Sequence, residues 1–174
     1  MIANKVTQKI IDLLESENIP YSIFEHQEVR TSEEAARVRN EPLKIGAKAI
    51  VFYADKIPLL VVVPGDKRVD TKAFKAVFEV KDLRMASPDE VLQITSVAVG
   101  GVPPFGSVMN LKTHCDKKVF ENEKIAFNAG AGTVTVKMKS ADFKLVENPI
   151  VGSFSIDKKS LSAKAEQLFA VKLS

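Results

Sequence analysis

The sequence predicts a mixed α/β fold of the α+β type, in which a curved, mixed and largely antiparallel sheet is flanked by short helices. Two apolar runs, 47–53 and 59–63, are separated by a short turn and predict a buried hairpin. Hydroxyl and carboxylate residues at capping spacing predict short helices. The predicted strands do not alternate regularly with long helices, which argues against a doubly wound parallel sheet.

The first half of the chain carries clear helix and strand signals. Apolar residues between Val6 and Leu14 recur at helical spacing, and Pro20 separates this helix from a strand. Thr31 and Glu34 have the spacing of a capping box, whose side chains accept free N–H groups at a helix start. The expected order is a helix to about residue 15, a strand at 21–24, a helix through 39, and strands at 47–53 and 59–63 joined by a turn at 55–58.

The second half repeats these signals. Asp70 is suited to cap a helix, and Ser87 with Glu90 forms a second capping box, strengthened by Pro88 at the first helical position. The expected order is a helix through about 78, a helix ending near 94, strands at 108–113, 124–128 and 133–138, a helix at 141–146 capped by Ser140, and a C-terminal helix within 160–173.

Several kinds of chemistry are excluded by what the sequence lacks. There is no phosphate-binding P-loop, and the glycines at 130–132 are too few for a dinucleotide fingerprint. One cysteine, Cys115, allows neither an internal disulfide nor a cysteine-rich zinc site, and no histidine pair has metal-ligand spacing. His114 and Cys115 are neighbours in an extended segment and point to opposite faces, so they do not form a nucleophilic pair. We therefore expect no metal and no cofactor.

Two features remain as candidates for function. Lys48 begins an apolar run, where a lysine is either a solvated strand end or a functional group. Segment 100–106 combines glycines, which let a backbone approach a ligand closely, with prolines that fix the loop's shape. Such a loop can aim N–H groups at a carbonyl; the alternative is a tight structural turn.

Six short motifs follow one another along most of the chain. They are TSEEAA at 31–36, GAKAIVF at 46–52, VVVPGDKRVD at 61–70, RMASPDEV at 84–91, VGGVPPFG at 99–106 and NAGAGT at 128–133. Each motif alone is weak, but in this order, over about 26–142, the chain resembles the YbaK/prolyl-tRNA editing-domain family, also called the aminoacyl-tRNA synthetase-associated domain.

The resemblance implies the curved mixed sheet and an enzyme that hydrolyses, in trans, the ester joining a wrong amino acid to the terminal adenosine of tRNA. It implies that Lys48 lies near the scissile ester and the terminal phosphate. It also implies that Gly100 and Gly101 belong to a catalytic loop whose backbone positions the substrate carbonyl. The substrate-binding residues that it implies are Thr31, Val102, Pro103, Pro104, Phe105, Gly106, Asn128, Ala129, Gly130 and Asp142.

The chain departs from the family at one point that bears on specificity. Members that clear alanine carry a histidine in the segment that here spans 127–133, and this chain has none there. The amino acid therefore stays open. Two further interpretations stay open. Asp142 also suits the first turn of a helix, where a carboxylate is favoured by the helix dipole. The basic residues Lys67, Arg68, Lys72 and Lys75 form either a solvated helix face or a contact with the tRNA backbone.

The expected context is a cytoplasmic, stand-alone protein with one editing domain over 1–174 and a C-terminal extension over 150–174. The N-terminus lacks a signal-peptide pattern, and the longest apolar run, 57–64, is too short to span a bilayer. The net charge of +3 permits a nucleic-acid partner. Expected partners are the aminoacylated acceptor end of tRNA and a synthetase, and no membrane. The alternatives are a non-catalytic binding module for aminoacyl-tRNA or a synthetase, and a hydrolase of another activated acyl ester.

Overall fold

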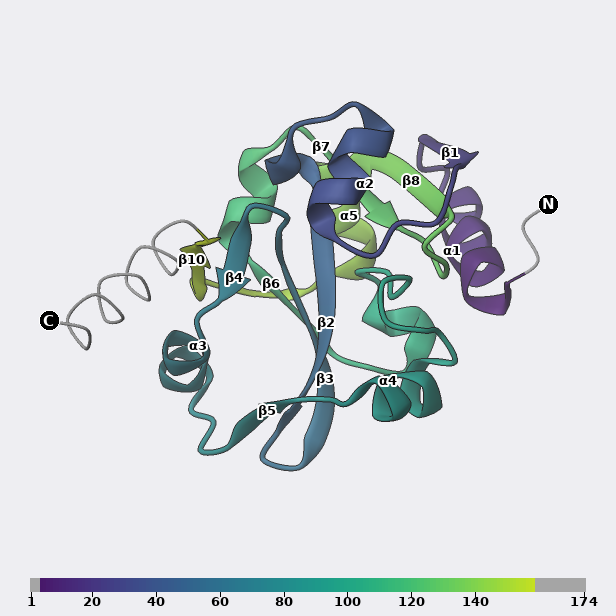
Figure 1. The fold of residues 1–174 in the computed structure, drawn as a ribbon. Helices are drawn as coiled ribbons and strands as arrows, with labels where there is room; N and C mark the ends of the chain where they lie inside the picture. Colours follow the sequence, from purple (N-terminus) through teal and green to yellow (C-terminus); the bar gives the residue numbers. More distant parts are fainter. Residues whose placement is uncertain (1–3, 159–174) are drawn as a thin grey trace, which may run out of the picture.

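The computed structural model describes residues 4–158, and it confirms the predicted mixed α/β fold (Figure 1). The elements are α1 (Lys5–Ser16), β1 (Tyr21–Glu25), α2 (Ser32–Arg39), η1 (Leu43–Ile45), β2 (Ala47–Ala54), β3 (Ile57–Pro64), β4 (Lys67–Val69), α3 (Thr71–Phe78), β5 (Leu83–Met85), α4 (Pro88–Thr95), η2 (Gly106–Met109), β6 (Thr113–Asp116), η3 (Lys117–Glu121), β7 (Lys124–Asn128), β8 (Val134–Lys139), α5 (Ser140–Glu147), β9 (Ile150–Gly152) and β10 (Ser155–Asp157).

A five-stranded sheet forms the centre of the molecule, in the order β5-β2-β3-β6-β9. The β2–β3 hairpin is antiparallel, with Lys48 opposite Val63, while β6 pairs parallel to both β3 and β9. A second sheet, β1-β8-β7, is antiparallel throughout, and an isolated bridge between Gly46 and Ala126 joins it to the beginning of β2. The sheets are therefore mixed and mostly antiparallel, as predicted.

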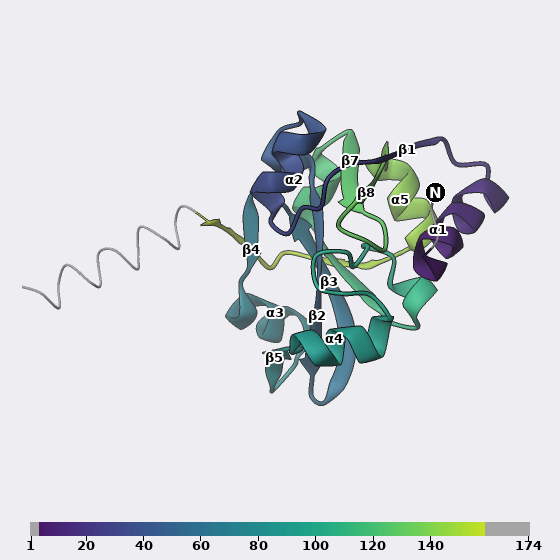
Figure 2. The same ribbon diagram turned by 45° about the vertical axis from the view of Figure 1, so that its right-hand side comes forward.

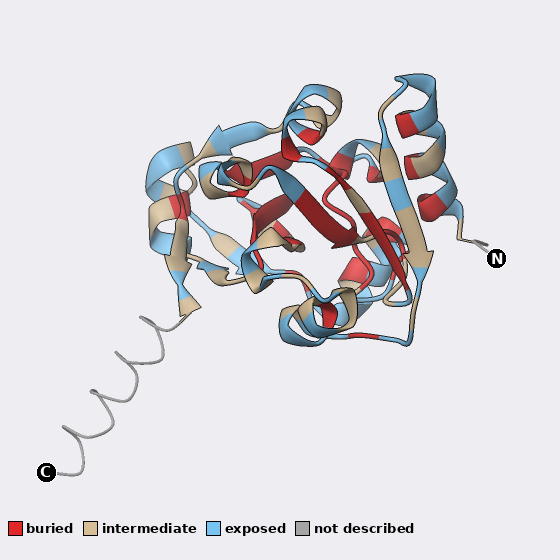
Figure 3. Ribbon diagram, turned by 90° about the horizontal axis from the view of Figure 1, so that it is seen from above, coloured by how far each residue is buried: buried red, intermediate tan, exposed pale blue. Residues whose placement is uncertain are grey.

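The central hairpin separates two apolar clusters because side chains alternate across a strand. Leu60 and Val62 face the larger cluster, which also holds α1, α4 and the second sheet. Val61 and Val63 face a smaller cluster built on Phe74 of α3. Helices α3 and α4 accordingly lie on opposite sides of the hairpin (Figure 2), and the buried residues concentrate in the central strands (Figure 3).

The helix starts follow the predicted caps with two differences. Ser87 and Glu90 form a complete capping box. Thr31 accepts from the amide of Glu34, but the Glu34 carboxylate accepts from Arg30 rather than from Thr31. The predicted Ser140 cap is wrong: Ser140 is the first helical residue, and its hydroxyl donates to the carbonyl of Asn122 instead.

The predicted strand at 108–113 is also wrong. The chain forms the short helix η2, and Asn110 adopts a left-handed conformation (φ 57°) that ends it, so the strand begins only at Thr113. The short strands β4, β5, β9 and β10 were not predicted from the sequence. The predicted C-terminal helix at 160–173 lies outside the described residues. Within residues 4–158, no helix combines the length and apolar character that spanning a membrane requires.

Candidate active site

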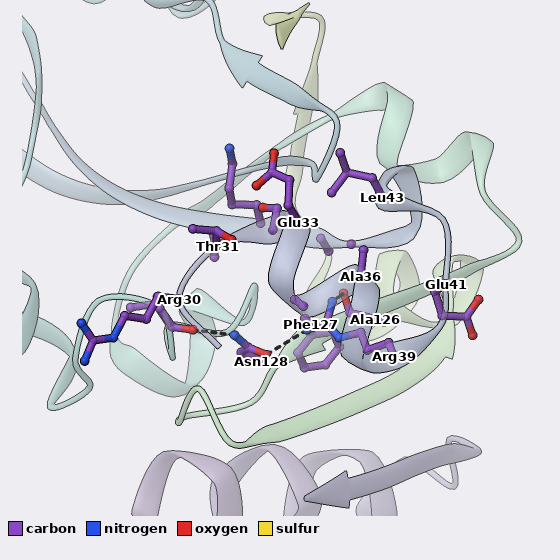
Figure 4. A pocket seen from close by; sticks show the side chains of 18 of the residues that line it. Arg30, Thr31, Glu33, Ala36, Arg39, Glu41, Leu43, Ala126, Phe127 and Asn128 are labelled. Carbon is purple, nitrogen blue, oxygen red and sulfur yellow. Dashed lines mark hydrogen bonds between the residues drawn. The ribbon is translucent and has the colours of Figure 1, made fainter. Parts of the chain in front are cut away.

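A cavity of about 310 Å³ opens beside the end of the central hairpin. Five regions line it: α2 with the turn after it, the start of β2, the glycine–proline loop, the end of β7, and Lys158 after β10. Its lining residues include Thr31, Glu33, Arg39, Lys48, Gly100, Val102, Asn128 and Lys158. In Figure 4, Thr31 and Glu33 lie along one side of the cavity, and Asn128 and Arg39 lie on another.

Lys48 is a half-buried lysine on the cavity wall. It shares a face of β2 with Ile50 and Phe52, and its Nζ donates to the carbonyl oxygen of Lys67 on β4 at 3.3 Å. Burial lowers the pKa of Lys48 to about 8; the positive charges of Lys158 and Arg68 act in the same direction. The lysine therefore titrates close to neutral pH, which distinguishes it from a solvated strand end.

The glycine–proline loop is held by the side chain of Asn128 and by backbone hydrogen bonds. Asn128 Nδ2 donates to the carbonyl oxygen of Gly100 at 2.6 Å, and Gly100 has a positive φ of 97° that favours glycine. The amide of Gly101 donates to Ala98, and its carbonyl accepts from the amide of Gly130 at 2.8 Å. The Gly101 amide is therefore engaged inside the loop and is not a free donor.

Two other amides of the loop belong to residues that line the cavity. The N–H groups of Gly100 and Val102 have no hydrogen-bond acceptor within the part of the chain that the structure describes, and both residues line the cavity. Backbone amides of this kind are the groups that stabilise an oxyanion when they converge on it. The role of Gly101 differs: a Cβ there would lie 2.8 Å from Cα of Ala131, so glycine permits the close packing of this loop on the segment after β7.

Arg39 is a functional candidate that sequence reasoning missed. It is the last residue of α2, and its guanidinium donates to Asn128 Oδ1 at 2.8 Å (Figure 4). It also donates to Thr135 Oγ1 at 3.0 Å and to the Ala126 carbonyl at 3.4 Å. Burial lowers its pKa to about 10, and Glu41 opposes that shift. Arg39 thus fixes the orientation of the Asn128 amide, which in turn holds the loop.

The structure brings together part of the predicted substrate-binding set. Thr31, Val102 and Asn128 line the cavity with Lys48 and Gly100. The remaining predicted residues do not line it: Gly101, Pro103, Pro104, Phe105, Gly106, Ala129, Gly130 and Asp142. Phe105 is a core residue between Phe127 and Phe143, and Asp142 lies in the first turn of α5.

Gly130 and Ala129 do not line the cavity, but their carbonyl groups connect the segment after β7 to α1. Gly130 has a positive φ of 103°, and its carbonyl accepts from Asn4 Nδ2 at 2.9 Å. The carbonyl of Ala129 accepts from the hydroxyl of Thr7. These two bonds tie the segment after β7 to the start of α1, so α1 contributes to the position of the loop although it does not line the cavity.

The cavity holds cations and amides but no activated nucleophile. Cys115 is buried and lies outside the cavity, and burial raises the pKa of its thiol. His114 is buried against Phe74 and Phe78 in the smaller apolar cluster and does not line the cavity. Within residues 4–158, no group of three His, Cys, Asp or Glu residues is placed to hold a metal ion. The arrangement suits hydrolysis of an ester that is already activated, with charge stabilisation from a lysine and amides.

Comparison with known proteins gives a matching family model and matching relatives. The family model described as "Aminoacyl-tRNA editing domain" matches residues 26–145. The chain is 30% identical over 152 residues to the "Multifunctional Ser/Thr-tRNA deacylase ProXp-y" of Escherichia coli (strain K12), covering 84% of this chain and 91% of that protein. It is also 28% identical over 109 residues to a proline–tRNA ligase of Thermosipho melanesiensis, covering 57% of this chain and 19% of the ligase.

A solved structure gives the same fold. A protein described as a trans-editing enzyme for prolyl-tRNA synthetase superimposes with a TM-score of 0.77 at 22% sequence identity. The match covers 88% of this chain and 99% of that chain. The arrangement of sheets and helices is therefore shared over nearly the whole of both molecules.

Proposed function

The chain belongs to the aminoacyl-tRNA editing domain family, and from this membership we propose how its cavity hydrolyses the ester of mischarged tRNA in trans. It is an aminoacyl-tRNA deacylase, as the sequence predicts, and its substrate is the aminoacylated acceptor end of tRNA. The observation that carries the assignment of the site is the placement of Lys48 and two free amides, those of Gly100 and Val102, on one cavity.

In the proposed reaction, the aminoacyl ester lies between Lys48 and the loop at 100–102. A water molecule attacks the carbonyl carbon, with the free hydroxyl of the terminal ribose or a second water accepting its proton, and negative charge develops on the carbonyl oxygen. The Lys48 ammonium and the free amides stabilise this charge. The bond between the carbonyl carbon and the ribose oxygen then breaks, and that oxygen takes a proton. Net hydrolysis consumes one water and releases the free amino acid and uncharged tRNA.

The substrate class follows from the relatives. The Escherichia coli protein is named as a Ser/Thr-tRNA deacylase, and similar domains occur in proline–tRNA ligases. We therefore propose small amino acids, serine and threonine first, as the ones that this chain releases, and a synthetase as a partner. We also propose a cytoplasmic location and one editing domain over 1–174, with 150–174 as its C-terminal extension.

Deacylation of a panel of mischarged tRNAs tests the proposal. tRNAs carrying labelled serine, threonine, alanine and other amino acids are incubated with the wild type, Lys48→Ala and a matched control, Lys124→Ala, which removes an exposed lysine at the start of β7. We expect selective release by the wild type and the control, and a loss of at least about 100-fold in kcat/KM for Lys48→Ala.

Two results would contradict the proposal. Equal release by Lys48→Ala and the wild type would remove Lys48 from the reaction. Absence of release from every member of the panel, with tRNA binding retained, would favour a non-catalytic binding module.

A further inference from the structure

Lys158 reaches the cavity from outside the matched family region. The family model ends at residue 145, whereas Lys158 lines the cavity together with Lys48. Strand β10 carries it there by pairing antiparallel with β4, in a register that places Ser155 opposite Val69 and Asp157 opposite Lys67. The carbonyl of Lys67 in β4 is the same group that accepts from Lys48. The C-terminal segment is therefore built into the wall on which Lys48 lies.

Among the described residues, Lys158 forms one ion pair, with Glu33 of α2. Its Nζ lies 3.0 Å from Oε1 of Glu33 in the first turn of α2. The lysine side chain is 21% exposed, whereas the glutamate side chain is 53% exposed. Ion pairs with a solvated carboxylate contribute little free energy. An anion that binds the Lys158 ammonium more tightly can therefore displace the Glu33 carboxylate.

The charges around Lys48 do not balance. The groups that influence its pKa are Lys158 and Arg68, which lower it, and Glu33, which raises it. Glu33 is already paired with Lys158, and Lys48 itself donates only to a neutral carbonyl within the described residues. Two cations, Lys48 and Lys158, therefore share the carboxylate of Glu33 on the cavity wall, and Arg68 adds positive charge from outside the lining. This surplus of positive charge is suited to an anion.

We propose that Lys158 completes an anion site at the mouth of the cavity, which binds the phosphate of the terminal nucleotide of tRNA, and that Glu33 holds the Lys158 ammonium until that phosphate replaces it. This inference rests on the proposed function, because it takes the acceptor end of tRNA as the ligand. In that ligand the ester is neutral, and negative charge resides on the phosphates alone. Lys158 is a binding residue in this scheme, and Lys48 remains free to act on the ester.

A purely structural role for the ion pair makes a different prediction. If Lys158 and Glu33 only fastened β10 to α2, removal of either partner would have the same effect. In the anion site the two variants act in opposite directions. Lys158→Ala removes a cation that binds phosphate, whereas Glu33→Gln removes a carboxylate that competes with phosphate for the same ammonium.

Binding of uncharged tRNA at several salt concentrations separates these cases. The proteins are the full-length wild type, Lys158→Ala, Lys158→Arg, Glu33→Gln and the control Lys124→Ala. For Lys158→Ala we expect the slope of log K against log salt to become shallower by about 0.7, so that the affinity lost between 50 and 200 mM salt falls by about threefold. Lys158→Arg should retain the wild-type slope, and Glu33→Gln should bind more tightly than the wild type at every salt concentration.

A second readout is the titration of Lys48, followed by NMR of its side chain. Lys158→Ala should raise the pKa of Lys48 and Glu33→Gln should lower it, because the two charges act on Lys48 with opposite sign. Equal slopes for Lys158→Ala and the wild type, parallel effects of the two variants, or failure of the wild type to bind tRNA would overturn the inference. These binding results do not depend on catalysis: an inactive wild type that shows the expected pattern would contradict the proposed function alone.

Discussion

The side-chain amide of Asn128 donates a 2.6 Å hydrogen bond to the carbonyl oxygen of Gly100, 28 residues earlier in the chain. Its carbonyl end accepts from Arg39 Nη2 at 2.8 Å, so the amide cannot rotate without losing both bonds. Because Gly100 precedes a free amide at Val102 on the same cavity, the bond fixes the part of the loop that is proposed to contact the reacting carbonyl.

Asn128→Ala should therefore lower catalysis more than stability. It removes the bond to Gly100 and leaves a half-buried Arg39 donor without its acceptor, which costs about 1–3 kcal/mol of folding free energy. We expect kcat to fall by about tenfold or more while the fold persists, because loop geometry is lost. The measurements are deacylation kinetics and urea unfolding.

Asn122→Ala is the matched control for this change. Asn122 Nδ2 also donates to a backbone carbonyl, that of Lys44, at 2.9 Å, but neither residue lines the cavity. A control with unchanged kcat supports the role of Asn128. An Asn128→Ala protein with wild-type kcat would show that the loop holds its shape without the bond.

Arg39 shows why part of the site was not predictable. In the sequence it is a basic residue in the last turn of a polar helix, where a solvated side chain that complements the helix dipole is the ordinary interpretation. Its three hydrogen-bond acceptors lie between Ala126 and Thr135, about ninety residues later, so only the tertiary fold reveals them. Lys48 and Gly100 could be singled out because each stands out from its local sequence, and both line the cavity; their roles in the reaction stay predictions.

Gly101→Ala tests the packing of the loop. A Cβ at this position would lie 2.8 Å from Cα and 2.9 Å from N of Ala131, and backbone atoms cannot move aside as a flexible side chain can. We expect a loss of about 1–3 kcal/mol in the free energy of unfolding, with a fall in kcat/KM because Gly100 moves as well. Urea unfolding and deacylation rates measure both.

Gly46→Ala provides the comparison. The backbone there has φ −60° and ψ 129°, and the closest approach of an added Cβ is 3.4 Å, so the substitution should leave stability within about 0.5 kcal/mol. If Gly101→Ala were equally harmless, the contact between the loop and Ala131 would not constrain the site.

The fold was predicted most completely where local and tertiary preferences agree. The β2–β3 hairpin has long apolar strands and a tight turn, and the Ser87 capping box forms as expected. The strands β4, β5, β9 and β10 have three residues each, too few for a period-two pattern to be recognised. They form because neighbouring strands supply hydrogen-bond partners for their backbone N–H and C=O groups. The pairing of β4 with β10 places Lys158 at the cavity.

Lys48 should make the reaction sensitive to pH near 8. If its ammonium stabilises the developing charge, kcat/KM corrected for spontaneous ester hydrolysis should fall above about pH 8, where the free enzyme loses that proton. The pH profile of the wild type measures this. A profile that keeps rising through pH 9 would contradict a cationic role.

The same lysine should limit stability. Burial lowers its pKa from 10.5 to about 8, so the unfolded state binds the proton more strongly and stability rises with pH between those values. Lys48→Met should therefore stabilise the protein at pH 7 by about 1 kcal/mol after solvent screening, or roughly 2–4 °C in Tm, while abolishing deacylation. A lower Tm for Lys48→Met would contradict this trade-off.

Cys115 should be inert in the folded protein. Its thiol is buried on β6, and burial together with the nearby Asp116 raises its pKa, so the reactive thiolate is scarce. We expect thiol-specific reagents at pH 8 to label it at least about 100-fold more slowly in the native protein than in 6 M urea. Deacylation should survive the reagent, and rapid inactivation would indicate that the sulfur is accessible to the reaction.

His114 should make stability depend on pH between about 5 and 7. Its Nδ1 is buried without a hydrogen-bond partner among residues 4–158, beside Phe78 at 4.8 Å between ring centroids. Burial lowers its pKa below 6.5, and Lys112 adds to that shift. Between the folded and unfolded pKa values the unfolded state binds a proton that the native state lacks, so the free energy of unfolding falls as the pH falls through 6.5.

His114→Leu separates this effect from other titrations. The variant keeps His26 and every carboxylate, so the difference between its pH–stability curve and that of the wild type reports His114 alone. We expect the two curves to diverge below about pH 6.5, with the variant more stable at pH 5 by about 1–3 kcal/mol because leucine leaves no unpaired polar group in the aromatic cluster. Parallel curves between pH 5 and 7.5 would show that His114 binds its proton equally well in both states, which is incompatible with its burial against Phe74 and Phe78.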